Sequence, residues 1–115
     1  MATHHAEPGE IVDLPTWAED LPIDKSKAIA KIAHLELARL VIGGGTEMHS
    51  AGYCQVPGPI VVHCLDGEIE LLMPDGARVI RAGQLVYLLG GTEHSIRGVR
   101  DSTVLLTIVL EPASG

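Results

Sequence analysis

The segment that decides the fold reads GQLVYLLGGTEH, from Gly83 to His94. Its apolar run, Leu85 to Leu89, is long enough to form one buried β-strand. The pair Gly90-Gly91 allows the chain to turn sharply after this run, because glycine adopts a positive φ without steric cost. The segment therefore predicts a strand and a turn that hold His94 at a rigid strand end.

At such a position His94 suits metal ligation or proton transfer. Imidazole titrates near neutrality and coordinates most transition metals. The alternative is a structural histidine that is held in place by hydrogen bonds. The local sequence leaves both interpretations open.

The spacing of this segment resembles the second signature of the cupin family, which runs Gly, five residues, Pro, any residue, Gly, two residues, His. Gly83, Gly91 and His94 match its two glycines and its histidine, and Leu89 stands where the proline should be. The resemblance covers about residues 35–110 and includes Gly67, which matches the glycine of the family's first signature.

That first signature runs His, any residue, His, three or four residues, Glu, six residues, Gly. Counting back from its glycine places Ile60 on the glutamate position and Cys54 and Val56 on the two histidine positions. With the longer spacing, the histidine positions fall on Tyr53 and Gln55. The glycines of the two signatures are thus present, whereas most of the residues at the metal-ligand positions differ from the signatures.

The resemblance implies an all-β fold, an antiparallel double-stranded β-helix of the cupin or jelly-roll type. It implies one barrel domain over residues 24–115, preceded by an extended N-terminal arm over residues 1–23. In the arm, Trp17 is the expected anchor against an apolar surface. In small cupins such an arm often packs on a partner subunit, and we expect a homodimer.

Residues 24–42 are ambiguous by themselves. Their Ala, Lys, Leu, Glu and Arg content favours a helix, with Asp24 or Ser26 as N-cap and Gly43 as its end. The resemblance instead implies strands over 27–32 and 35–42, with a turn near His34, and this is the prediction adopted. The other predicted strands span 60–65, 68–73, 77–81, 85–89, 95–100 and 103–110.

The composition of the chain limits the classes of partner that it can bind. The 115 residues carry a formal net charge of −7, and only 3% of them are aromatic, which argues against nucleic acid and anionic membranes as partners. No apolar stretch reaches the roughly 18 residues that a membrane-spanning helix needs. Cys54 and Cys64 are expected to be free thiols in a cytoplasmic protein, because the N-terminus does not resemble a secretion signal.

A cupin metal site resembles a set of three histidines and one glutamate around a single divalent metal inside the barrel. The resemblance therefore implies a metal such as Fe, Mn, Zn or Ni, with His94, Cys54, His49 and His63 as candidate ligands. Side chains alternate along a strand, so if Ile60 faces inward His63 faces outward, unless a bulge near Pro59 shifts the register. Cys64 is expected to be a buried apolar residue.

Five residues are candidates for the lining of a ligand pocket: Tyr53, Val56, Ile60, Val62 and Tyr87. The leading hypothesis is a metal-binding cupin that acts on or binds a small organic molecule, with dioxygenase-like or isomerase-like chemistry. The alternative is a metal-free cupin that binds a small ligand or serves in regulation. A third reading is a structural dimer without a ligand.

Overall fold

The computed structural model describes residues 5–17, 26–47 and 54–110, and of residues 26 and 27 only the backbone. These ranges contain eight β-strands that pair only in antiparallel fashion. The strands are β1 (Ser26–Ile32), β2 (Leu35–Ile42), β3 (Ile60–Asp66), β4 (Glu68–Met73), β5 (Gly76–Arg81), β6 (Leu85–Leu88), β7 (Ser95–Gly98) and β8 (Ser102–Val109). The predicted all-β class is confirmed, and each predicted strand is present within two residues of its expected ends.

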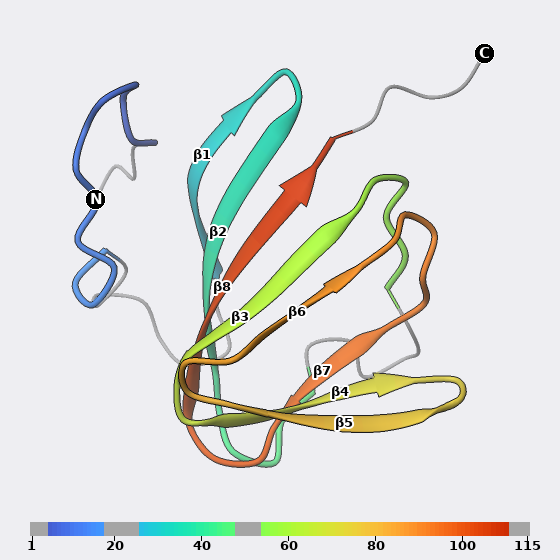
Figure 1. The fold of residues 1–115 in the computed structure, drawn as a ribbon. Helices are drawn as coiled ribbons and strands as arrows, with labels where there is room; N and C mark the ends of the chain where they lie inside the picture. The colour runs from blue at the N-terminus through green and yellow to red at the C-terminus, as the bar shows by residue number, and fades with distance from the viewer. Residues whose placement is uncertain (1–4, 18–25, 48–53, 111–115) are drawn as a thin grey trace.

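The strands form two sheets that lie against each other (Figure 1). One sheet has the order β1-β2-β8-β3-β6, and the other has the order β5-β4-β7. Between them lies an aliphatic core in which Ile42, Val62, Ile69, Leu71 and Val104 are fully buried. The low aromatic content of the chain is thus matched by a core that is built from branched aliphatic side chains, which pack well on pleated sheets.

The segment that was ambiguous in sequence forms strands. β1 pairs with β2 around the turn at Ala33 and His34, and β2 pairs with β8 over its whole length, from Leu35 opposite Val109 to Ile42 opposite Ser102. The helix that residue propensities favoured is therefore absent from residues 26–42. Pairing with β8, a strand about 65 residues further along, outweighs the small differences in local propensity.

The apolar run at residues 85–89 differs from its prediction in burial. It was expected to be a buried strand, but β6 ends at Leu88, and only Leu88 is buried, whereas Tyr87 is 68% exposed and Leu89 is 70% exposed. The reason is position, because β6 is an edge strand that pairs with β3 alone. One face of the strand meets the core and the other meets solvent.

The described part of the N-terminal arm, residues 5–17, lies on the five-stranded sheet of its own chain. The Ala6 amide donates a hydrogen bond to the Ile29 carbonyl oxygen at 2.6 Å, and Arg39 Nη2 donates one to the Pro15 carbonyl oxygen at 3.3 Å. Trp17 is half-buried. The described residues contain no helix that could cross a membrane.

Candidate functional site

A cavity of about 70 Å³ lies between the two sheets. Six aliphatic side chains, one thiol and one imidazole line it. The lining residues are Leu40, Cys54, Val56, Ile60, His94, Ile96, Leu106 and Ile108. The cavity is therefore an apolar chamber with two chemically reactive groups in its wall.

His94 is 4% exposed and is held in one orientation by the chain that precedes it. Its Nδ1 lies 2.9 Å from the carbonyl oxygen of Thr92, which can only accept a hydrogen bond. In the neutral ring the proton is therefore on Nδ1, and Nε2 keeps its lone pair. Nε2 is the atom that can accept a hydrogen bond or coordinate a metal.

Cys54 is placed beside His94 by the backbone. The Cys54 amide donates to the His94 carbonyl oxygen at 2.6 Å, and the His94 amide donates to the Cys54 carbonyl oxygen at 2.9 Å. This isolated antiparallel bridge joins two segments that are 40 residues apart in sequence. Cys54 is half-buried and carries no disulfide, as predicted for both cysteines.

The Gly90-Gly91 pair allows these two segments to approach. Gly91 adopts a φ of +82°, and its amide donates to the carbonyl oxygen of Val56 at 2.7 Å. A Cβ atom at Gly90 would lie 1.9 Å from the carbonyl oxygen of Pro57, so only glycine fits there. The expected turn after the strand is thus present, and its Gly91 amide is bonded to Val56, a residue that lines the cavity.

Some of the predicted site residues lie on the inner face of the five-stranded sheet, and others lie on its outer face. Val56 and Ile60 line the cavity, and Val62 is fully buried in the core next to it. Tyr87 pairs with Val61, and His63 pairs with Leu85. Along their strands these four residues alternate with residues that face the core, so His63 and Tyr87 lie on the outer face of the sheet. His63 lies on the outer face, as strand alternation predicted, because the pairing of β3 shows no register shift from Ile60 to His63. His49 and Tyr53 lie outside the described residues.

The described residues do not form a complete metal site. Cys54 and His94 provide one thiol and one imidazole at the cavity, and no group of three or more His, Cys, Asp or Glu side chains gathers anywhere in the described ranges. Zinc sites in proteins have at least three protein ligands. Two ligands are therefore too few, and a metal here would need a donor from outside the described part of the chain.

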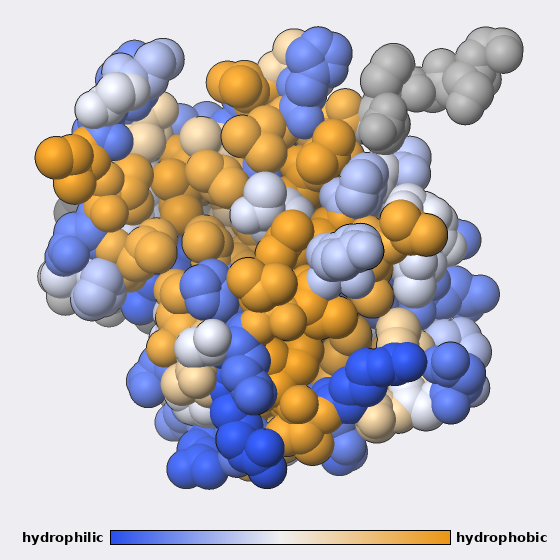
Figure 2. All heavy atoms as spheres, in the orientation of Figure 1, coloured by the Kyte–Doolittle hydropathy of each residue, from blue (hydrophilic) through white to orange (hydrophobic). Residues whose placement is uncertain are grey.

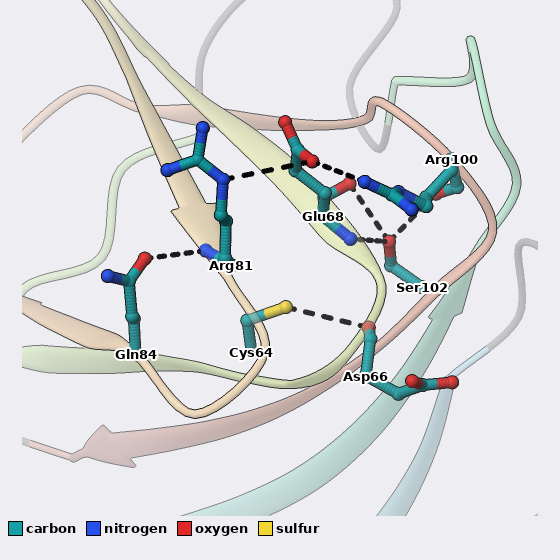
Figure 3. A network of polar contacts seen from close by, with 7 residues as sticks. All are labelled: Cys64, Asp66, Glu68, Arg81, Gln84, Arg100 and Ser102. Carbon is teal, nitrogen blue, oxygen red and sulfur yellow. Dashed lines mark hydrogen bonds and ion pairs between the residues drawn. The ribbon is translucent and has the colours of Figure 1, made fainter.

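A polar cluster at the other ends of β3 and β8 was not found by sequence reasoning (Figure 3). Glu68 Oε1 accepts a hydrogen bond from Arg100 Nη2 at 2.7 Å, and the Ser102 hydroxyl accepts one from the Glu68 amide at 2.9 Å. Arg100 is well exposed, so the ion pair adds little stability. The cluster ties the β3–β4 turn to the β7–β8 turn, which is a structural role.

The aliphatic half of the cavity was also missed in sequence. Leu40, Ile96, Leu106 and Ile108 come from three different strands. Each strand shows the alternation that assigns an inward face, but alternation does not tell which inward residues meet. The pairing of β2 and β3 with β8 brings Leu40, Leu106 and Ile108 together, and Ile96 meets them from β7 of the other sheet.

No protein-family model matches the sequence, and no curated protein matches it. Solved structures do match in fold. A cupin superfamily protein from Desulfitobacterium hafniense is 13% identical with a TM-score of 0.77, over 96% of this chain and 100% of the other. A conserved protein of unknown function from Streptococcus pyogenes is 21% identical with a TM-score of 0.75, over 98% and 97%.

A cupin-2 domain protein from Shewanella frigidimarina is 13% identical with a TM-score of 0.72, over 89% of this chain and 94% of its own. At these identities the similarity establishes the fold alone. The chain has the cupin fold, as the resemblance of its glycine spacing implied.

Proposed function

We propose that this cupin-fold chain binds a small, mainly apolar organic molecule in the cavity between its sheets. The support is the lining, in which six aliphatic side chains surround Cys54 and His94. Ligand sites of this kind combine apolar walls with a few placed polar groups that orient the ligand.

The volume of the cavity limits the size of the ligand. A buried apolar cavity of about 150 Å³ is known to hold benzene. The present cavity of about 70 Å³ is half that size, so its ligand is smaller than benzene. Short branched alcohols such as propan-2-ol have a smaller size than benzene and a single polar group.

His94 provides the polar contact. Because its Nδ1 proton is engaged by the Thr92 carbonyl oxygen, Nε2 acts as an acceptor toward a ligand hydroxyl or amide N–H. The Cys54 thiol is a weak hydrogen-bond donor and acceptor, so it can contact either the polar end or the apolar end of such a ligand. The ligand class is thus a small hydrogen-bond donor with an apolar body.

A metal-bound form is the second candidate. The observation that favours it is the presence of Cys54 and His94 in the same wall, since thiolate and imidazole are both zinc and iron ligands. It needs a third ligand, for which the sequence offers His49. When bound, such a metal would supply Lewis-acid or oxygen chemistry, as in the dioxygenase-like or isomerase-like activities that the family resemblance implied.

Two measurements on protein purified without a histidine tag separate these candidates. We expect propan-2-ol to shift the methyl resonances of Ile60, Ile96 and Ile108 saturably, and elemental analysis to find less than stoichiometric metal. Ile60→Phe should abolish the shifts by filling the cavity. Ile32→Phe is the control, because Ile32 is 63% exposed and lies outside the cavity.

One equivalent of metal that disappears in His94→Ala would establish the metal-bound form and overturn the apolar-ligand proposal. Absence of saturable shifts in the metal-free protein would also overturn it.

A further inference from the structure

The outer edge of β6 is an open border of the five-stranded sheet (Figure 1). β6 pairs with β3 on one side, and no strand of the described residues pairs with its other side. Leu85 and Tyr87 of this strand are well exposed. An edge strand offers unpaired backbone N–H and C=O groups to an extended chain that lies beside it. β6 can therefore accept one more strand.

The hydrogen bonds of β3 show which backbone groups of β6 point to this open edge. The Cys64 amide donates to the carbonyl oxygen of Gln84 at 2.9 Å. Bonded pairs recur at every second residue of an antiparallel ladder, so the even-numbered residues of β6 are the ones bonded to β3. The N–H and C=O groups of Leu85 and Tyr87 point the other way. The open edge thus presents one donor and one acceptor at each of these two residues.

The other sheet edges carry features that hinder the addition of a strand. β1 contains a bulge, and its Ile29 carbonyl oxygen already accepts a hydrogen bond from the Ala6 amide of the N-terminal arm. β5 carries two arginines, and β7 is bridged to Gly44 and Glu47. Bulges, charges and covering segments are the means by which soluble proteins keep a sheet edge from pairing.

The β6 edge lacks such protection and suits a second copy of the chain. Residues 82–92 contain no charged residue and no proline. The whole chain has a formal net charge of −7, so two copies repel each other over most of their surface, and an uncharged edge is where they can approach. Antiparallel pairing of β6 with itself is two-fold symmetric, so both copies use the same residues.

We propose that β6 pairs edge to edge with β6 of a second copy, so that one continuous sheet runs through both copies. Val86 lies at the two-fold axis, and Leu85 of one copy is opposite Tyr87 of the other. These two residues exchange backbone hydrogen bonds, and their side chains form a cross-strand apolar pair on the outer face. The pairing does not depend on the ligand proposed for the barrel cavity.

Amide hydrogen exchange of the wild-type chain tests this pairing without any variant. At a concentration at which light scattering gives the dimer, the Leu85 and Tyr87 amides should exchange at least about tenfold more slowly than the Val79 amide, after correction for intrinsic rates. Val79 is the internal reference because its amide points to the open edge of β5. The hydrogen bond from the Ala82 amide to the Gly67 carbonyl oxygen, at 3.2 Å, fixes this alternation.

Tyr87→Pro removes the amide proton at the open edge and keeps the hydrogen bonds to β3, and proline is tolerated at such edge positions. The dissociation constant of the dimer should rise about tenfold or more, because each copy loses one hydrogen bond across the contact. Val79→Pro is the matched control at the β5 edge and should dimerise as the wild type does.

Three results would each overturn the proposal. They are a monomeric wild type, a dimer in which the Leu85 and Tyr87 amides exchange as fast as that of Val79, and a folded Tyr87→Pro with an unchanged dissociation constant. If Tyr87→Pro does not fold, the exchange measurement on the wild type decides.

Discussion

The chemical properties of single residues in this chain depend on how deeply they are buried. Cys54 and Cys64 are both free thiols, yet Cys54 is half-buried at the cavity wall and Cys64 is fully buried in the core. Burial raises the pKa of the Cys64 thiol above its ordinary value of 9.0, and the carboxylates of Asp66 and Glu68 add to the rise. The prediction that Cys64 is a buried apolar residue is confirmed.

This shift makes the stability of the fold sensitive to alkaline pH. The unfolded chain releases the Cys64 proton at lower pH than the folded chain, so the contribution of the neutral thiol is complete below about pH 9 and is lost as the pH rises above it. We expect the free energy of unfolding of the wild type to fall relative to Cys64→Val between about pH 9 and 10.5. Urea denaturation at several pH values measures this difference.

The difference between the two proteins should be constant between about pH 7 and 8, where the thiol is neutral in both states. A difference that stays constant up to about pH 10.5 would contradict the prediction.

At the scale of elements, the turn after β6 packs closely against the segment that holds Val56 and Pro57. Gly91 needs a left-handed backbone, whereas Gly90 needs the absence of a side chain. The two glycines are adjacent in sequence but are required for different physical reasons. The same substitution at both positions therefore separates the two requirements.

We expect Gly91→Asn to lower the free energy of unfolding by less than about 1 kcal/mol, since asparagine tolerates a positive φ and the nearest atom to its Cβ would be 3.9 Å away. Gly90→Asn should cost about 1–3 kcal/mol or more, because its Cβ would overlap the Pro57 carbonyl oxygen. Thermal or urea unfolding measures both. Equal costs would show that the close approach of the two segments does not constrain the fold.

At the scale of the whole molecule, apolar side chains gather over the strands of the five-stranded sheet (Figure 2). On β6, Leu85 is 58% exposed and Tyr87 is 68% exposed, and both point away from the core. Exposed apolar patches on soluble proteins often mark interaction surfaces. The homodimer expected from sequence remains a prediction, and this surface is where we expect a second copy to bind.

Light scattering should give twice the chain mass of 12.2 kDa at micromolar concentration. Tyr87→Arg should shift the protein toward the monomer, because it places a charge in the centre of the proposed contact. Val79→Arg is the control, since Val79 is 45% exposed on β5 of the other sheet. A monomeric wild type, or a dimer that Tyr87→Arg leaves intact, would refute this interface.

The sequence by itself determined where the strands lie and which glycines shape the turns. Turn residues and the spacing of Gly67, Gly83, Gly91 and His94 placed the six strands between residues 60 and 110, and strand parity placed His63 on the outer face. These features follow from local rules, because the two-residue period of a strand and the conformational freedom of glycine act within a few residues.

Only the tertiary structure decided which residues meet and which faces are covered. It assigned residues 26–42 to strands through pairing with β8, exposed one face of β6 at the sheet edge, and joined Cys54 to His94. It also buried Arg39 under an arm whose Pro15 lies 24 residues earlier in the chain. Strand pairing and burial depend on contacts between segments that are distant in sequence, and local propensities hold no information about those contacts.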